Sequence, residues 1–371
     1  MVEYCEKQFK SILNKHKFIN PWGWNRYSIS PYQGCQFNCI YCYARSQKYN
    51  RNLSGSTIFV KKNAAHMLDL RISRAHTLLP DVVGMSGIGD PYQVCEDVFK
   101  TTRQCLEVLA RHGWPVHIWT KSPLVLRDLD ILSEIAETSW AAVSFTITTT
   151  DNEVARFLEP NAVLPEERFE AISEIKKTKI QTGVAAIPIV PFLEDNKRGI
   201  ESLVKRAKKA GADYVLFSSG MTMENGQALR FLKTLARIYP ELVEKFEDLY
   251  RFKYSSKEYN GLYSPEKRYT VKTFQKAFEV FKKCEMSYRV KRFIPSDFRK
   301  TAYIVAEKLL NEACRLQDLG KAWSNTYWAG QNIQNLKEPI EDVAERGELQ
   351  QIRNVNSEIE SFIKDVLENV N

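Results

Sequence analysis

The sequence lacks long uninterrupted runs of apolar residues. No window approaches the roughly 18 apolar residues that a membrane-spanning helix needs. The first stretch, MVEYCEKQFKSILNKHKF, interrupts its apolar positions with Lys, Glu and Asn, so it contains no apolar core of a secretory signal. We therefore expect a protein that has no membrane partner and lies in the cytoplasm.

Gly/Ser linkers, tandem repeats and low-complexity segments are also absent from the sequence. Of its 371 residues, 44% are hydrophobic and 26% are charged, which is ordinary for a globular protein and argues against disorder. A chain of this length is expected to form about two domains.

Disulfide bonds are not expected, because a reducing compartment keeps thiols free and a tight group of cysteines there is typical of metal binding or catalysis. Three of the eight cysteines lie close together in GCQFNCIYCYAR, residues 34–45. The other five are scattered, and we expect them to be small buried apolar residues. They are Cys5, Cys95, Cys105, Cys284 and Cys314.

The net charge of +8 is distributed unevenly. Residues 296–371 contain 9 Lys and Arg against 13 Asp and Glu, a net charge of −4, which leaves +12 for residues 1–295. A basic body suits a polyanionic partner, because Lys and Arg displace condensed counterions from phosphates. The alternative is a basic surface that is simply solvated.

Short β-rich segments alternate with helical patterns from about residue 27 to residue 217. The strands are nearly continuous in apolar residues, which predicts a parallel sheet covered by helices. We expect an α/β fold, a partial (β/α)6 barrel whose chemistry collects at the carboxyl ends of the strands. One helix is expected over 97–113, with Val98 on its buried face. The expected strands are 26–30, 81–87, 115–122, 141–149, 180–190 and 212–220.

From Ser296 the pattern is purely helical. The first of these helices begins at a good capping residue and ends at Gly320. We therefore expect two domains: residues 1–295, a partial barrel with a helical extension, and residues 296–371, a small all-α domain.

The close cysteines, Cys35, Cys39 and Cys42, have the spacing C-x3-C-x2-C and follow the first expected strand. Three thiolates can hold three irons of a [4Fe–4S] cluster and leave the fourth iron open. A structural zinc ion would need four ligands, and three core cysteines are the other alternative.

This spacing, with an aromatic residue before the last cysteine, resembles the signature of radical SAM enzymes. The resemblance implies a [4Fe–4S] cluster on Cys35, Cys39 and Cys42, with S-adenosylmethionine (SAM) bound to the open iron. It further implies reductive cleavage of SAM to a 5′-deoxyadenosyl radical that abstracts a hydrogen atom from the substrate. An external one-electron reductant such as ferredoxin or flavodoxin would then be needed.

Five further segments resemble the spore photoproduct lyase-like branch, the DNA repair photolyases. This similarity covers about half of the chain and implies a nucleic-acid substrate, with DNA favoured, and lesion repair or base modification as the reaction. The segments are 30–45, 89–96, 119–132, 143–172 and 187–196.

The resemblance also implies residues that contact SAM. A backbone edge at the end of the second strand would run along the amino end of SAM, Lys121 would face its carboxylate or the substrate, and hydroxyls on the fourth strand would reach it. A glycine-rich turn and ordinary strand formers are the respective alternatives. The implied residues are Ser86, Gly87, Gly89, Asp90, Lys121, Ser144 and Thr146.

Tyr41 and Tyr43 flank Cys42, at places where spore photoproduct lyases have tyrosines implicated in hydrogen-atom relay; packing around the cluster is the alternative. The sequence departs from that family at Gly87, where the family has a cysteine hydrogen donor. Cys95, eight residues further on, is a weak substitute. The departure puts the spore photoproduct reaction itself in doubt.

Residues 298–371 resemble the helix-hairpin-helix N-terminal domain of family X DNA polymerases. Asn354 and Asn356 replace the hairpin glycines, and Asn tolerates the left-handed conformation better than most residues. The domain's negative charge argues against strong phosphate binding. DNA binding, protein docking and a structural cap all stay open.

Two other functions also stay open. The first keeps the radical chemistry but acts on a peptide, a protein or a small metabolite. The second is a non-catalytic, metal-stabilised module that binds nucleic acid.

Overall fold

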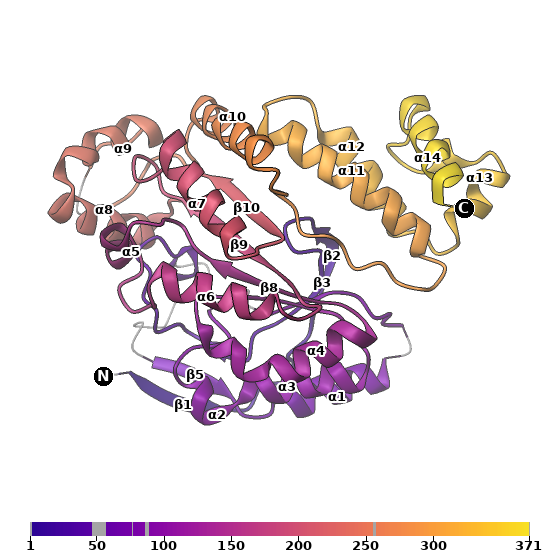
Figure 1. Cartoon of the computed structure of the whole chain (residues 1–371), viewed down its shortest axis with the longest axis horizontal. Helices are drawn as coiled ribbons and strands as arrows, with labels where there is room; N and C mark the ends of the chain where they lie inside the picture. Colours follow the sequence, from indigo (N-terminus) through magenta and orange to yellow (C-terminus); the bar gives the residue numbers. More distant parts are fainter. Residues whose placement is uncertain (1, 47–56, 76, 86–88, 255–256, 371) are drawn as a thin grey trace.

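The structure is a computed structural model that describes residues 2–46, 57–75, 77–85, 89–254 and 257–370. Its centre is a curved sheet in which seven strands lie in the order β10-β9-β8-β7-β6-β3-β2 (Figure 1). Their bounds are β2 Asn14–Asn20, β3 Asn25–Ile29, β6 Val83–Met85, β7 Val116–Thr120, β8 Ala141–Thr146, β9 Gln181–Ile189 and β10 Tyr214–Ser219.

All six expected strands are present, and they pair in parallel from β3 to β10. The predicted half-barrel of parallel strands is therefore confirmed. Strand β2 was not predicted; it pairs antiparallel with β3 and forms the outer edge of the sheet. A small second sheet, also not predicted, consists of β1 Glu3–Lys7, β5 Thr57–Lys61 and β4 Tyr32–Gln33.

Helices cover the outer face of the main sheet and share one apolar core with it. Alternate strand residues such as Ala141, Val143 and Phe145 point into this core. The covering helices are α1 Ala64–Arg74, α3 Thr101–Arg111, α4 Leu129–Thr138, α6 Pro165–Ile175, α7 Lys197–Lys209 and α10 Lys267–Cys284.

The single helix expected over 97–113 was wrong. Lys100 adopts a positive φ of 50°, which ends the short helix α2, Glu96–Phe99, and starts α3. Val98, expected on the buried face, is 76% exposed, because it belongs to the short helix rather than to α3.

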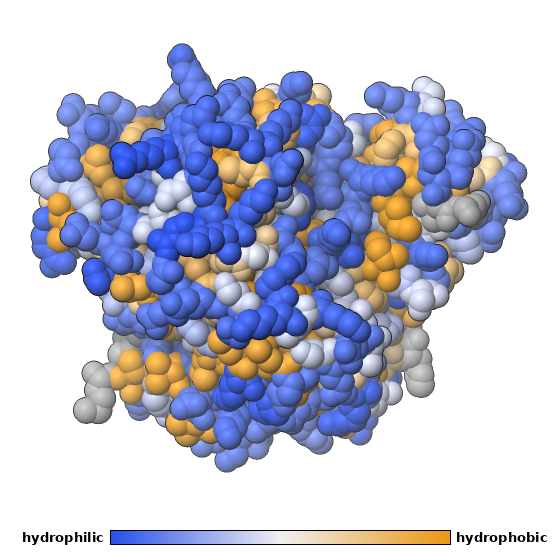
Figure 2. Space-filling view, viewed as in Figure 1, coloured by the Kyte–Doolittle hydropathy of each residue, from blue (hydrophilic) through white to orange (hydrophobic). Residues whose placement is uncertain are grey.

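The C-terminal helices pack on the inner face of the sheet. They share a second apolar cluster with Ala142, Tyr214 and Leu216, which alternate with the outer-face residues along β8 and β10. The space-filling view shows these helices as a lobe at the upper right, above a notch (Figure 2). The helices are α11 Lys300–Asp318, α12 Ser324–Ile333, α13 Ile340–Glu345 and α14 Ser357–Val370.

Helix α11 begins at Lys300 and not at Ser296, and the side chain of Asp297 pairs with Arg299 just before it. Gly320 follows the end of α11 with a φ of 73°, as expected for the glycine that was predicted to stop this helix. Asn354 has a φ of 70°, the left-handed conformation expected at the hairpin. No helix among the described residues is long and apolar enough to span a bilayer.

Residues 221–266 form a third group of helices beside the cysteine loop. Apolar side chains of α8 and α9 pack against Phe37, Ile40 and Tyr41 of that loop. The bounds of these two helices are α8 Asn225–Ile238 and α9 Val243–Tyr250, and α5, earlier in the chain, is Asn152–Leu158. A segment whose sequence gave no functional signal thus covers the predicted cluster loop.

Candidate functional site: the cysteine loop and the ends of β7 and β8

The cysteine loop, residues 34–45, begins directly after β4. Cys39 is buried, Cys35 and Cys42 are half-buried, and all three are free thiols. Burial, together with the nearby Asp90 and Cys42, raises the pKa of Cys35 to about 11. The cysteines are therefore close enough to influence one another, and a thiolate here needs a compensating positive charge.

Two cations supply that charge. Burial raises the pKa of Cys39, and the positive charge of Lys121, at the end of β7, opposes this rise. The second cation is Arg230. Burial lowers its pKa, and the charges of Cys42 and Cys39 raise it. The loop thus fits three thiolates, the donor set of a [4Fe–4S] cluster with one open iron.

No three His, Cys, Asp or Glu side chains among the described residues are arranged to hold one metal ion.

Segment 89–93 supports the Cys35 side of the loop. Gly89 has a φ of 108°, and a Cβ there would lie 2.7 Å from the carbonyl oxygen of Gly34. The buried Gln93 donates from Nε2 to the same carbonyl at 3.1 Å and accepts at Oε1 from the Gln36 N–H at 3.0 Å. Only a glycine at position 89 permits this close approach, and Gln93 then fixes the loop's backbone.

Asp90, predicted to contact SAM, joins two parts of the protein. Its Oδ1 accepts hydrogen bonds from the Tyr92 N–H at 2.9 Å and the Thr120 hydroxyl at 2.6 Å. Its Oδ2 accepts from the Lys121 N–H at 2.8 Å. Burial raises the pKa of Asp90, and these bonds oppose the rise. The carboxylate thereby holds the β6–α2 connection against the end of β7, which Lys121 directly follows.

A buried charged network lies behind Cys39. The Tyr41 hydroxyl donates to Glu159 Oε1, and Glu159 Oε2 is 2.6 Å from Arg168 Nη1. Arg168 also donates to the carbonyl oxygen of Thr146 at 2.6 Å. Burial would raise the pKa of Glu159, but Arg168 and Lys121 hold it below its usual value. The carboxylate is therefore ionised and paired, as a buried charge must be.

The half-buried Lys121 belongs to the same network, with Nζ 5.7 Å from the centre of the Tyr41 ring. Burial lowers its pKa, but Cys39, Glu159 and Asp90 raise it above the ordinary value. Lys121 is therefore a fixed positive charge at the strand end, where the sequence predicted a SAM carboxylate or substrate contact.

Ser144 lies lower on the inner face of the sheet, in a neutral hydrogen-bond chain. Burial lowers the pKa of His117 to about 4, so its ring is neutral. His117 Nδ1 is 3.1 Å from the carbonyl oxygen of Gly23 and must donate to it, so Nε2 accepts from the Ser144 hydroxyl at 2.8 Å. Tyr214 then donates to Ser144 at 2.8 Å.

These bonds use the proton of Ser144, so little of this hydroxyl is left for a ligand, and a SAM contact by Ser144 stays a prediction. Thr146, on the same strand face but higher, is 9% exposed.

The other predicted residues are dispersed. Tyr43 is 47% exposed, on the short 3-10 helix η1, Tyr43–Arg45. Cys95 is buried in an apolar cluster with Tyr32 and Ile58, and burial raises its pKa to about 12. That surrounding suits a packing residue better than a hydrogen donor to a substrate. Ser86 and Gly87 lie outside the described residues.

Of the scattered cysteines, Cys105, Cys284 and Cys314 are buried, as is Cys95, which agrees with the expectation of small core residues. Cys5 is only half-buried.

Sequence reasoning missed two residues of α8 that hold the loop. Arg230 Nη2 donates to the Asn38 carbonyl at 3.1 Å and to Asn38 Oδ1 at 2.8 Å, while its buried Nη1 has no hydrogen-bond partner among the residues that the structure describes. Gln227 donates to the carbonyl oxygen of Tyr41 at 3.2 Å. The one local signal was Asn38 itself, whose φ of 60° suits an asparagine in a tight loop.

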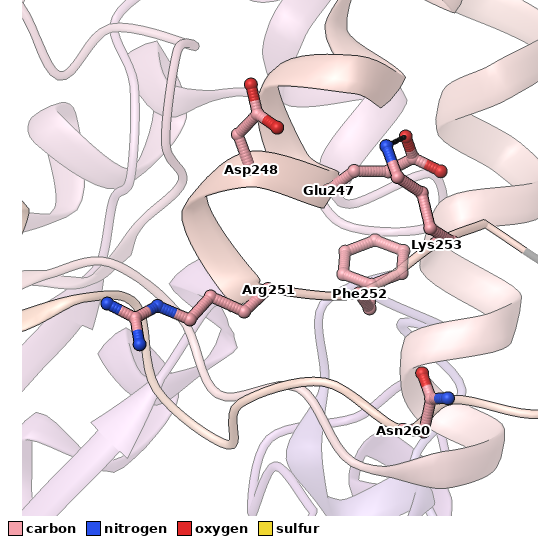
Figure 3. Close-up of a pocket in the computed structure, with 6 residues that line it drawn as sticks. All are labelled: Glu247, Asp248, Arg251, Phe252, Lys253 and Asn260. Carbon is pink, nitrogen blue, oxygen red and sulfur yellow. Dashed lines mark hydrogen bonds and ion pairs between the residues drawn. The ribbon is translucent and has the colours of Figure 1, made fainter.

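A cavity of about 510 Å³ opens elsewhere, beside α9 (Figure 3). Both cations that line it are already paired, Lys253 with Glu247 at 3.2 Å and Arg251 with Glu266. None of its lining residues belongs to the cysteine loop, so we place no chemistry there.

Residues 29–207 match the family model of the Radical SAM superfamily. The chain carries a radical SAM domain. The cofactors of this family are a [4Fe–4S] cluster and SAM. The matched region begins at Ile29, the last residue of β3, and contains the cysteine loop and the four strands β6 to β9.

Relatives of this radical SAM chain include an uncharacterised protein of Mycobacterium tuberculosis, 29% identical over 257 residues, which are 67% of this chain and 74% of that protein. An uncharacterised protein of Methanocaldococcus jannaschii is 32% identical over 172 residues, 46% of this chain and 62% of that protein. Among solved structures, a spore photoproduct lyase mutant with bound AdoMet and dinucleoside spore photoproduct has a TM-score of 0.56 at 16% identity, covering 76% of this chain and 79% of that one. At this identity the likeness establishes the fold.

Proposed function

We propose that this radical SAM enzyme acts on nucleic acid, most simply on a damaged or modified DNA base. The observation that carries the proposal is the fold shared with spore photoproduct lyase over 76% of the chain. The structure of that lyase contains a bound dinucleoside spore photoproduct. The basic body, residues 1–295 at +12, supports the same class of substrate.

The residues have distinct tasks in this proposal. Cys35, Cys39 and Cys42 hold the cluster, which with SAM supplies the 5′-deoxyadenosyl radical. Lys121 places a fixed positive charge where the SAM carboxylate or a substrate phosphate would lie. Glu159 and Arg168 hold Tyr41 in place beside Cys39.

Buried Tyr41 is the better of the two candidate hydrogen relays, because exposed Tyr43 would lose a radical to solvent. An external one-electron reductant such as ferredoxin or flavodoxin is part of the proposal.

The test is anaerobic reconstitution with iron, sulfide and SAM, followed by measurement of 5′-deoxyadenosine and of deuterium transferred into it from labelled DNA, RNA or protein. We expect transfer from an oligonucleotide. Cys39→Ala should abolish cluster formation and product, whereas Cys105→Ala, which removes a buried thiol outside the loop, should keep both. Transfer from a protein fraction and from no oligonucleotide would instead support a peptide or protein substrate.

A further inference from the structure

The outer edge of the main sheet is basic. Strand β2 is the last strand, and its first five residues, from Asn14 to Phe18, are exposed. Lys15 and Lys17 have no acidic partner among the described residues. An edge strand with lysines is protected from aggregation, but it also offers free positive charge.

Cations from remote parts of the sequence gather around this strand. Partial burial lowers the pKa of Lys15, and the like charges of Arg26, Lys337 and Arg71 lower it further. Arg26 is neutralised by Asp81 at 3.4 Å, but Lys337 and Arg71 are exposed and without an ion pair in the described part of the chain. Like charges that repel one another without a local counter-ion are stabilised by a polyanion.

A row of aromatic rings continues this edge onto α12. The ring of Phe18, 38% exposed, meets Trp328 edge to face at 5.0 Å. Trp328 contacts Tyr327 at 5.3 Å, and Tyr327 contacts Trp323 at 5.6 Å. These three residues of the row are half-buried, so part of each ring system is accessible. Lys17 Nζ lies 5.2 Å from the Phe18 ring, which brings charge and ring together.

The strand and the helix are joined firmly. The buried side chain of Gln331 donates to the Ile19 carbonyl at 2.8 Å and accepts from the Ile19 N–H at 3.2 Å. Gln331 therefore pairs with the backbone of β2 as a neighbouring strand would. The cations of β2 and the rings of α12 form one continuous surface.

We propose that this surface, the β2–α12 edge, binds single-stranded nucleic acid, with Lys15, Lys17 and Lys337 on phosphates and Phe18 and Trp328 against bases. Positive charge that follows the backbone together with stacking rings is what binds single strands without sequence preference. An acidic peptide would satisfy the lysines but would leave the rings unused. The proposal deepens the proposed function, and rests on it, by naming where the nucleic acid is held outside the barrel.

The test measures fluorescence anisotropy of a labelled oligothymidine with the full chain over a range of salt concentrations. Each phosphate contact contributes roughly 0.7 to the slope of log affinity against log salt for single strands, so Lys15→Gln with Lys17→Gln should lower the slope by about 1.4. Phe18→Ala should weaken binding about tenfold, the size of one lost stacking contact. Thermal melting checks that each variant folds.

The matched control is Lys245→Gln with Lys272→Gln, two exposed lysines of α9 and α10 that have no ion pair in the described residues. This pair removes the same charge but should leave the salt slope unchanged. Equal losses in both double variants would overturn the inference, as would wild-type protein that binds no oligothymidine.

Two further outcomes separate this inference from the proposed function. If the edge variants bind normally while oligonucleotide still donates deuterium to 5′-deoxyadenosine, the edge is wrong and the proposed substrate stands. If the edge variants lose binding but no oligonucleotide donates deuterium, the edge stands and the proposed substrate is wrong. If the edge variants lose more binding to polyglutamate or to anionic vesicles than to oligothymidine, the edge does not bind nucleic acid as we propose.

Discussion

Two levels of the inner face of the sheet have opposite electrical character. At the strand ends, Lys121, Glu159 and Arg168 form a charged network beside Cys39. Lower on the same face, the buried His117, Ser144 and Tyr214 form a neutral chain. Burial penalises charge at both levels. The comparison indicates that buried charges persist where they pair with one another beside the cysteine loop, and that neutral groups close the barrel below.

The largest expected effect breaks the charged level. Arg168→Met removes the partner of Glu159, and both side chains are nearly inaccessible, at 1% and 2%. Breaking a buried pair by removing one partner costs about 3–5 kcal/mol, because the remaining charge stays buried without its ion-pair partner. Urea unfolding of the unreconstituted chain measures the free energy of unfolding.

The matched control is Lys197→Ala, which breaks the exposed pair between Lys197 and Glu279 at 2.8 Å. We expect about 1 kcal/mol or less from this change. A loss in Arg168→Met no larger than in the control would contradict the view that the network carries buried charge.

The second effect is the pH dependence of protein stability that His117, in the neutral chain, produces. In the unfolded chain a histidine takes up its proton near pH 6.5, whereas His117 in the fold takes it up only near pH 4. As the pH falls from 6.5 towards 4, the unfolded state binds the extra proton and the protein loses stability, by about 3 kcal/mol in total. This contribution is fully present above pH 6.5.

Melting temperatures between pH 4.5 and pH 7.5 measure this loss. His117→Gln, which has no group that titrates in this range, should flatten the acid side of the profile. An unchanged profile in that variant would mean that other groups govern the acid sensitivity.

The smallest effect concerns the centre of the neutral chain. Ser144→Ala removes the partner of His117 and of the Tyr214 hydroxyl, and a buried polar group without a partner costs about 1–3 kcal/mol. Ser202→Ala, which removes a half-buried hydroxyl 2.9 Å from Thr150, should cost less. Equal effects would mean that the neutral chain adds nothing to ordinary hydroxyl packing. Denaturant unfolding at pH 7.5 makes the comparison.

Local patterns predicted much of the fold. The six parallel strands were found from their continuous apolar residues, and the helix stop at Gly320 from one glycine. The break at Lys100 was not found, because a lysine with a positive φ has no local signature. The small sheet was missed because β4 has two residues and gains its place only by pairing with β5.

The candidate site divides in the same way. The spacing of Cys35, Cys39 and Cys42 indicated the cluster from twelve consecutive residues of sequence, because ligand spacing in a loop is a local property. Arg230 could not be found in this way, since it contacts Asn38 across 192 positions.

The sequence by itself determined the parallel sheet and the cysteine loop, since periodicity and spacing are properties of neighbouring residues. The radical SAM chemistry was implied by the resemblance of that loop to a known family. Only the tertiary structure decided that Asp90 holds a strand end, that Ser144 lies in a neutral chain, and that β2 meets α12. These depend on contacts between segments far apart in the chain, and burial then sets which groups keep their charge.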